Sequence, residues 1–256
     1  MVVVAFATLA TPWLVPVEFP LARAAVVHST LFIVMRAIDL ARDPTPRSLP
    51  WRWLFLMSIA DLRKVESIRP TLDVAAIRST IGYFVLAAVG VVLVQHGWRW
   101  VGGVLLIYAV ADCAQAALRG LAAALGNRVP IMHRMPITAT SVRAFWSRHW
   151  NLTVSWWLRD HVAEPLRRAG HPALGLVAAF VVSAAVHLWL VFVPIGLGPA
   201  ITMAAFFVVQ GILAALEGPL HVRRWPTWSR HVWTLAAVLV PSPLFVEPFI
   251  GVVIGS

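Results

Sequence analysis

Long apolar stretches recur along this chain of 256 residues, separated by short polar or arginine-rich segments. A helix that crosses a membrane needs about 20 mostly apolar residues. The pattern predicts an all-α, multi-pass transmembrane helical bundle of about seven spans, at residues 2–20, 21–41, 77–95, 100–125, 172–194, 199–217 and 232–254. Prolines in the first and last of these segments predict that both are kinked or broken. No internal repeat or low-complexity linker divides the chain, so we expect one membrane domain over residues 1–256.

Two connecting segments have a helical pattern of their own. Residues 51–69 mix aromatic and aliphatic side chains with charged ones, which is typical of an amphipathic helix at the lipid headgroups. Residues 141–164 are predicted to form a helix, because Ser141 suits an N-cap and Pro165 disfavours helical geometry in the residue before it. Apolar residues recur through this segment at helical spacing. A second stripe of the same period is polar and contains Arg148, Asn151, Ser155 and Arg159.

The composition indicates that the bilayer is the solvent. The chain is 60% hydrophobic and 12% charged, with a mean hydropathy of +0.80. Soluble domains carry about 25% charged residues. A water-soluble enzyme, a nucleic-acid-binding protein and a disordered chain are therefore excluded. The net charge of +10 comes from basic residues between the apolar segments, where they act as topology signals and contact membrane lipids.

Arginine gathers in three connections, at residues 42–76, 126–171 and 218–231, whereas the turns at 96–99 and 195–198 hold one arginine and none. With seven spans, all three basic connections fall on one side of the membrane. The positive-inside rule then places them and the N-terminus in the cytoplasm. We expect an integral protein of a bacterial cytoplasmic membrane. The first residues lack a charged region and are expected to form a first span, not a cleaved signal peptide.

His187 is the first candidate for chemistry. It lies about 22 Å along its predicted span at 1.5 Å per residue, deep in the bilayer. Ionisable groups at that depth are costly and by default functional, and they face the bundle interior. Ser183 lies one turn earlier on the same face and could bond to a ring nitrogen. The alternative is a neutral structural histidine bonded to a carbonyl of another helix.

Asp112 is a second intramembrane ionisable residue. It shares one face of its predicted helix with three other polar residues, Tyr108, Gln115 and Arg119. A buried pairing of Asp112 with Arg119 is favoured over a role in binding substrate.

The remaining candidates are weaker. His28 and Glu217 are interpreted as structural or lumen-lining. Cys113 is the sole cysteine, which excludes a disulfide or a thiolate metal site within one chain. The sequence contains no zinc-binding pattern, no glycine-rich phosphate loop and no Gly-x-Ser-x-Gly elbow. We therefore expect no metal and no redox cofactor.

Residues 145–151 read Phe-Trp-Ser-Arg-His-Trp-Asn. This segment resembles the signature of the membrane-bound O-acyltransferase superfamily, and it meets in full the Phe-Trp-x-x-x-Trp-Asn pattern of the wax synthase branch. The following Leu-Arg-Asp at 158–160 and Glu-Pro at 164–165 resemble that branch as well. The sterol branch and the wax synthase branch of the superfamily both place a histidine in the next long apolar segment, where His187 falls. The sterol branch has Asp-Trp where this chain has Arg-His, and plant wax synthases are usually longer.

The resemblance implies an acyl-CoA-dependent O-acyltransferase that esterifies a hydrophobic alcohol, with acyl-coenzyme A as co-substrate. In the family, the histidine activates the acceptor hydroxyl and the asparagine helps to position the thioester, so these roles pass to His187 and Asn151. A neutral histidine suits a general base, because its pKa lies near 6.5. The arginines nearest the motif are candidates for holding the coenzyme A phosphates. The candidate substrate-binding residues are Trp146, Trp150, Arg148, Arg159, Ser155 and Ser183.

Other functions remain open at this point. The acyl group can be long or as short as acetyl, so an acetyltransferase acting on a small-molecule hydroxyl is one alternative. A non-enzymatic transporter or scaffold is another, although carriers usually show inverted repeats, which are not found here. An acyltransferase acting on a protein or polysaccharide hydroxyl is disfavoured by the cytoplasmic placement of the motif.

Overall fold

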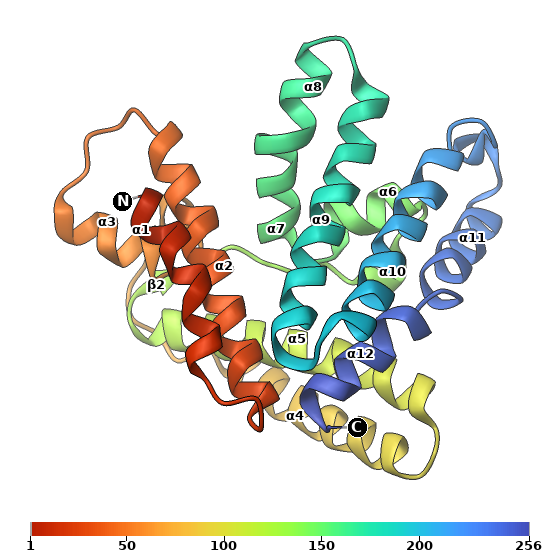
Figure 1. Cartoon of the computed structure of the whole chain (residues 1–256), viewed down its shortest axis with the longest axis horizontal. Coiled ribbons are helices and arrows are strands. Elements are labelled where there is room, and N and C mark those ends of the chain that lie inside the picture. The colour runs from red at the N-terminus through yellow and green to blue at the C-terminus, as the bar shows by residue number, and fades with distance from the viewer. Residues whose placement is uncertain (1, 256) are drawn as a thin grey trace.

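The computed structural model describes residues 2–255, and these are almost entirely helical (Figure 1). The α-helices are α1 (Val2–Ala7), α2 (Pro20–Arg42), α3 (Leu49–Leu56), α4 (Val74–Gln95), α5 (Arg99–Ala124), α6 (Val142–Ala144), α7 (Leu152–Leu158), α8 (Glu164–Arg168), α9 (Pro172–Ile195), α10 (Leu197–Leu216), α11 (Thr227–Leu239) and α12 (Pro243–Val253). Short 3₁₀ segments are η1 (Thr8–Leu14), η2 (Leu62–Lys64), η3 (Pro136–Thr138) and η6 (Val222–Arg224), and π-helical turns are η4 (Phe145–His149) and η5 (Arg159–Ala163). Two short strands, β1 (Glu66–Ser67) and β2 (Asn127–Arg128), pair antiparallel.

Five helices, α2, α4, α5, α9 and α10, are long and apolar enough to cross a membrane, and the bent pair α11 and α12 can form a sixth span. The all-α, multi-pass fold is confirmed. The ends of the five long helices agree with the predicted spans to within three residues. The last predicted span is broken, as its prolines indicated, with a bend of 45° between α11 and α12. The single domain over residues 1–256 stays a prediction.

Two predicted elements differ in the structure. Residues 2–20 do not form one span, because the helical hydrogen bonding ends in the 3₁₀ segment η1, which contains Pro12. Residues 51–69 do not form one helix either. There the helix stops at Leu56, and the chain continues through η2 and β1, which ties this connection to β2.

A buried arginine fixes the first segment against the bundle. Arg23 in α2 is 9% exposed, and its Nε donates to the Val15 carbonyl at 2.7 Å. Its Nη1 donates to the Val193 carbonyl of α9 at 3.0 Å. Arg23 donates both of these hydrogen bonds to backbone carbonyls, which is how a charge is tolerated at such a position.

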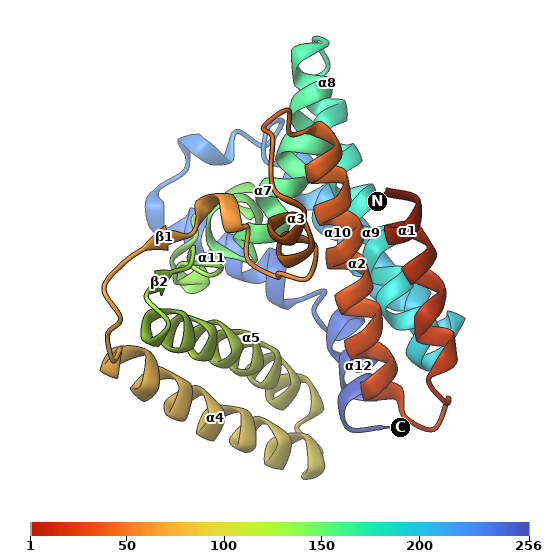
Figure 2. The same cartoon turned by 90° about the vertical axis from the view of Figure 1, so that its left-hand side faces the viewer.

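The long helices are arranged as a layer with an oblique hairpin. Helices α2, α9 and α10 run side by side, and the α4–α5 hairpin crosses them at an angle (Figures 1 and 2). Helix α12 packs against α5, α9 and α10 and joins the two parts. Helices α4 and α5 approach closely where Gly90 meets Gly102, since a Cβ on Gly102 would lie 2.8 Å from the Gly90 carbonyl oxygen.

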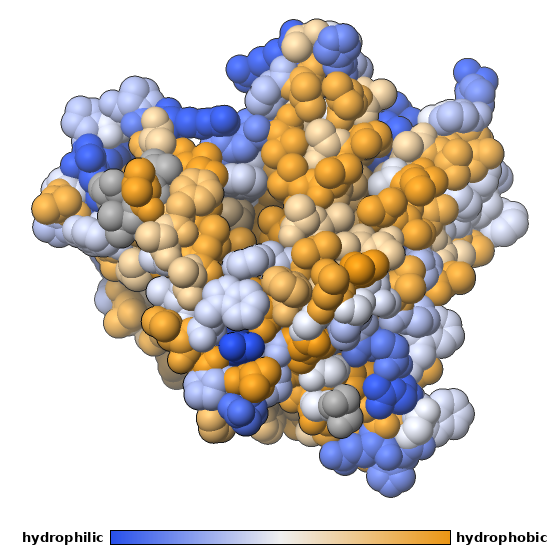
Figure 3. All heavy atoms as spheres, viewed as in Figure 1, coloured by the Kyte–Doolittle hydropathy of each residue, from blue (hydrophilic) through white to orange (hydrophobic). Residues whose placement is uncertain are grey.

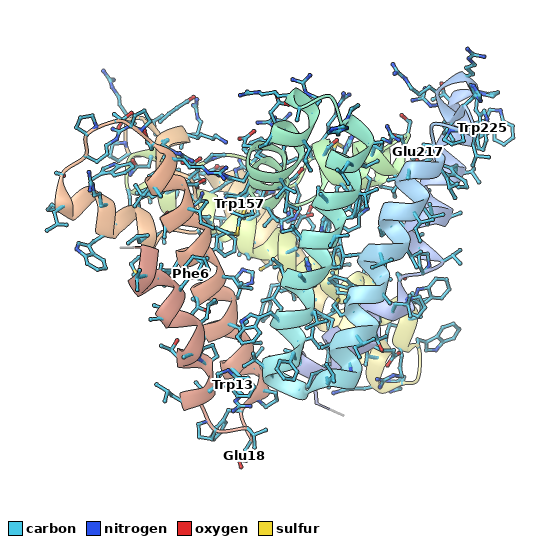
Figure 4. The ribbon with its side chains drawn as sticks, turned by 45° about the horizontal axis from the view of Figure 1, so that its top comes forward. Phe6, Trp13, Glu18, Trp157, Glu217 and Trp225 are labelled. Atoms are coloured by element: carbon cyan, nitrogen blue, oxygen red, sulfur yellow. The ribbon has the colours of Figure 1, made fainter. Side chains whose placement is uncertain are left out.

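The arginine-rich connections and the bare turns lie at opposite ends of the molecule (Figures 1 and 2). Trp13 and Glu18 mark one end, and Glu217 and Trp225 mark the other (Figure 4). Hydrophobic residues cover much of the surface of the central helices, and hydrophilic ones gather at the two margins (Figure 3). This face therefore has the apolar band and polar margins of a protein that sits in a bilayer.

Candidate active site

The signature segment is not the continuous helix that its periodicity predicted. Ser141 is the N-cap, and its hydroxyl accepts a hydrogen bond from the Ala144 amide at 3.0 Å. Helix α6 then passes into the π-helical turn η4 and ends at Trp150, which has an extended backbone. Asn151 follows with φ 41° and ψ 61°, and a new helix, α7, begins after it. The helical stretch after the break continues through Pro165 to Arg168. The prediction of one continuous helix is therefore wrong, and so is the prediction that it ends at residue 164.

The break at Asn151 has a local physical cause. Asparagine adopts left-handed backbone geometry more readily than most other residues that carry a side chain, and it also caps helices well. Here it does both, since its side-chain oxygen accepts from the Val154 amide at 3.4 Å. Its amide nitrogen makes no hydrogen bond within residues 2–255 and can donate to a ligand oxygen. Because the helix restarts here, Arg148 no longer shares a continuous stripe with Ser155 and Arg159.

The start of the signature segment is held by a buried carboxylate. Glu217, at the end of α10, is 6% exposed and accepts hydrogen bonds from the backbone amides of Val142 and Arg143. It also accepts from the Trp233 indole at 3.3 Å. Glu217 therefore has a structural role at the entry to the motif.

His187 lies in α9 with its ring stacked on Phe207 of α10, the ring centroids 3.8 Å apart. Its Nδ1 is 2.8 Å from the Ser183 carbonyl oxygen one turn earlier. A carbonyl can only accept, so Nδ1 carries the proton and Nε2 of the neutral ring presents a lone pair. Nε2 makes no hydrogen bond within residues 2–255. The ring is thus oriented by the backbone of its own helix, not by the Ser183 hydroxyl or by another helix.

One aromatic ring links the signature segment to this histidine. Trp146 of η4 packs against Phe206 and against Phe207 itself, with ring centroids 6.1 and 5.6 Å away. The Trp146 indole donates to Gln210 at 3.0 Å, and the fully buried Gln210 donates to the Ala237 carbonyl at 2.8 Å. The structure therefore brings Trp146 and His187 to the same ring, whereas Asn151 and His187 share no hydrogen bond within the described residues.

A cavity of about 470 Å³ opens on the side of the arginine-rich connections. Trp156 and Trp157 of α7 line it just after the Asn151 bend, and Trp157 lies between α7 and α2 (Figure 4). Its basic lining residues are Arg36, Arg42, Arg47, Arg63 and Lys64, and its acidic ones are Asp39, Asp43, Asp61 and Asp160.

The cations of this cavity differ in how far they are neutralised. Arg36 pairs with Asp39 at 2.9 Å, and Arg63 pairs with Asp61 at the same distance. Within residues 2–255, Arg42 and Arg47 have no carboxylate at salt-bridge distance. Arg42 contacts the His161 ring nitrogen at 2.7 Å, and Arg47 stacks on Trp51. These two guanidinium groups are free to bind an anionic ligand.

The paired groups form a fixed, charged wall. Burial alone would raise the pKa of Asp61, but the hydrogen bonds and charge of Arg63 outweigh it and hold that pKa below its ordinary value. The Asp61 hydrogen bond in turn raises the pKa of Arg63. Asp39 is 3% exposed and also accepts from His161 Nε2 at 2.7 Å. Both carboxylates therefore keep neighbouring cations in place.

Sequence reasoning did not identify this cavity. From the sequence, the arginine-rich connections as a whole are candidates for holding the coenzyme A phosphates, with Arg148 and Arg159 nearest the motif. Arg148 and Arg159 do not line the cavity, and Arg159 pairs with its neighbour Asp160 at 2.8 Å. The clustering of six basic residues between 36 and 64 was the available signal.

The pairing predicted for Asp112 is also different. Asp112 is 5% exposed, and its carboxylate lies 3.2 Å from Nδ1 of His133. Arg119 pairs instead with Asp73, the N-cap of α4, at 3.3 Å. Arg119 lies two turns further along α5, at the end where the α4 helix begins, so Asp73 is the nearer partner. Within residues 2–255, no group of three or more histidine, cysteine, aspartate or glutamate residues could hold a metal ion.

Comparison with known proteins assigns the central part of the chain. Residues 129–209 match the model of the membrane bound O-acyl transferase family. Over 121 residues the chain is 36% identical to the probable long-chain-alcohol O-fatty-acyltransferase 2 of Arabidopsis thaliana, covering 44% of this chain and 35% of that protein. Over 131 residues it is 37% identical to the probable long-chain-alcohol O-fatty-acyltransferase 3 of the same plant, covering 45% and 38%.

The part of this chain that matches spans less than two fifths of the length of each of these two relatives. Both relatives are plant proteins, so the bacterial membrane stays a prediction. The matched segment contains the whole signature, His187 and the Phe207 ring between them. Through this segment the chain resembles the membrane-bound O-acyltransferase family and, within it, plant proteins named as long-chain-alcohol O-fatty-acyltransferases.

Proposed function

We propose that this protein transfers an acyl group from acyl-coenzyme A to the hydroxyl of a hydrophobic alcohol within the membrane. The observation that carries the proposal is the packing of signature Trp146 and of His187 against one ring, with Nε2 of His187 unpartnered within residues 2–255. The plant relatives are named as long-chain-alcohol O-fatty-acyltransferases, which supports a fatty acyl donor and an alcohol acceptor.

The proposed step uses His187 as the general base. Nε2 takes the proton of the alcohol as its oxygen attacks the thioester carbon, and a tetrahedral intermediate with an oxyanion forms. The free amide N–H groups of Asn151 donate to that oxygen or hold the thioester in place. Collapse of the intermediate breaks the C–S bond. The coenzyme A thiolate takes the proton from the imidazolium, which leaves an ester, a thiol and a neutral histidine.

The cavity near α7 is the proposed binding site for the polar part of the donor. Arg42 and Arg47, which form no salt bridge within residues 2–255, supply the positive charge that phosphates need, and Lys64 lies over the Trp156 ring at 4.3 Å. The cavity lies at the end of the molecule that carries the basic connections, which the positive-inside rule places in the cytoplasm, where coenzyme A is present. The acyl chain and the alcohol partition into the bilayer and reach His187 from the side.

The test is ester synthesis by purified protein in nanodiscs. Labelled acetyl-, octanoyl- and palmitoyl-coenzyme A are offered with a panel of alcohols to the wild type, His187→Ala and Asn151→Ala. We expect ester from the wild type, and a loss of at least about 100-fold for the histidine variant, since general base catalysis contributes about 10² to 10⁴. The ranking of donors separates a long-chain acyltransferase from an acetyltransferase.

His96→Ala is a matched control. His96 makes the same bond as His187, from Nδ1 to the carbonyl four residues earlier, at 2.8 Å, but it lies at the exposed end of α4. It should keep wild-type activity. Equal activity of wild type and His187→Ala would rule out His187 as the base. Absence of ester together with absence of coenzyme A binding in calorimetry would favour a transporter or a scaffold.

A further inference from the structure

The chain just before the signature segment is bonded to the bend inside it. The Arg134 amide donates to the His149 carbonyl at 2.8 Å, and the Leu152 amide donates to the Met132 carbonyl at 2.8 Å. These two bonds lie on either side of Asn151 in sequence. Residues 132–134, which we call the clamp segment, therefore hold both ends of the bend that contains Asn151.

The clamp segment is in turn fixed to helix α5. The Gln115 side-chain oxygen accepts from the backbone amides of Met132 and His133. The Asp112 carboxylate, one turn earlier on α5, faces Nδ1 of His133 at 3.2 Å. Asp112 and Gln115 thus face the same short stretch of backbone from one side of α5.

The His133 ring lies between that carboxylate and the signature itself. Its other neighbour is the Trp150 indole, with ring centroids 4.6 Å apart. The side chains of His133 and Asp112 are 8% and 6% exposed. Within residues 2–255, Nδ1 of His133 has no hydrogen bond of good geometry, and the carboxylate is the group it faces. A buried carboxylate and a buried imidazole are each costly alone, so their contact restrains where the ring can lie.

We propose that Asp112 and His133 are positioning residues that fix the Trp150–Asn151 bend and so place the Asn151 amide. A shift of Trp150 would take it off the His133 ring, and a shift of that ring would take it away from the buried Asp112 carboxylate. The kinetic part of this inference rests on the proposed function, whereas the structural part does not.

Amide hydrogen exchange in nanodiscs tests the structural part. Asp112→Leu removes the carboxylate, and His133→Phe keeps a ring against Trp150 but removes the polar contact. In both, we expect peptides that cover residues 130–136 and 148–154 to exchange about tenfold faster, with α9 and α10 unchanged. Asp112→Asn keeps an acceptor and should restore most of the protection. Arg119→Gln, on the same helix but paired with Asp73, is the control and should exchange like the wild type.

Two results of this experiment would overturn the proposal. One is unchanged exchange of both peptides in Asp112→Leu and in His133→Phe. The other is an equal acceleration over α9 and α10, which would mean that the pair supports the whole fold and does not hold the bend in particular.

Kinetics test the link to Asn151. We expect Asp112→Leu to lower kcat by about 10- to 100-fold, as small displacements of a reacting group do. The KM for acyl-coenzyme A should change less than about threefold, because the cavity residues are untouched. In an Asn151→Ala background the same change should have no further effect, since residues that act through one group are not additive. Full additivity would overturn the proposal. If the wild type makes no ester, the proposed function fails, and the exchange result alone decides whether the pair fixes the bend.

Discussion

Replacement of Glu217 tests whether one carboxylate holds the entry to the signature segment. In Glu217→Ala, the amides of Val142 and Arg143 and the Trp233 indole all lose their acceptor. Val142 is 0% exposed, so water does not readily replace the carboxylate there. Removing one partner from a buried charged network costs about 3–5 kcal/mol. A midpoint near 4 kcal/mol corresponds to a fall in melting temperature of about 8–16 °C at roughly 2–4 °C per kcal/mol.

Glu217→Gln separates geometry from charge. Glutamine keeps one acceptor oxygen for the Val142 amide but lacks the charge and the second oxygen. Hydrogen bonds to charged groups are worth about 1.5–3 kcal/mol, so we expect a loss of about 2 kcal/mol, or about 4–8 °C. Glu247→Gln is the matched surface control. Its pair with Arg99 is about half exposed on both sides and is worth about 0–1 kcal/mol.

Thermal unfolding followed by size-exclusion chromatography in detergent measures all three variants against the wild type. The expected order of stability is Glu247→Gln, then Glu217→Gln, then Glu217→Ala. A loss below about 1 kcal/mol in Glu217→Ala would refute the argument that this carboxylate holds the start of the signature segment. Equal losses in the two Glu217 variants would show that the charge matters and the individual hydrogen bonds do not.

Two further predictions concern the helix hairpin and the connection after α7. Gly102→Ala should lower the melting temperature of the protein, because the new Cβ would lie 2.8 Å from the backbone of Val94 and force α4 away from α5. The expected cost is about 1–3 kcal/mol. Gly82→Ala, whose new Cβ would meet nothing within 4 Å, should leave the melting temperature unchanged. Glu164 has its pKa lowered from 4.5 to about 2 by hydrogen bonds to two arginines of α8. A lowered pKa means that its stabilising effect is present above pH 4.5 and is lost as the pH falls toward 2. Thermal melting in acid should therefore show a steeper fall for the wild type than for Glu164→Gln, and parallel curves would contradict this.

The long helices were predictable because each one contains most of the information that defines it. A run of about 20 apolar residues satisfies its own backbone hydrogen bonds in lipid, so length and hydropathy alone place it. The prolines of residues 2–20 indicated a kink or a break, but composition does not show that the break leaves no single long helix there. The chain there continues as the 3₁₀ segment η1, and Arg23 donates a hydrogen bond to the Val15 carbonyl directly after it.

Residues of the candidate site stand out in the sequence only where their types are unusual for their surroundings. His187 stands out as an ionisable group in an apolar helix, and Asn151 ends a recognisable signature. The aromatic and polar spacing of residues 141–164 predicted one helix, because periodicity does not register a left-handed residue such as Asn151. The bend depends on Asn151 itself and on the clamp segment, whose two bonds to it come from residues 15 to 20 positions away in the sequence.

In the proposed reaction, the acyl donor and the alcohol reach the region of Asn151 and His187 from two different sides. The cavity is lined by Thr153, Trp156 and Trp157, which lie within two turns of Asn151 on α7. On the other side of Asn151, Trp146 packs against the Phe207 ring, on which the His187 ring stacks. A donor held at Arg42 and Arg47 would therefore meet Asn151 from the polar end of the molecule, and an alcohol dissolved in the bilayer would meet His187 from the apolar band. Because the asparagine lies in a bend between two helices, its position depends on the contacts that hold the bend. This is why replacements of Asp112, His133 and Glu217 are expected to change the proposed reaction without touching the Phe207 ring.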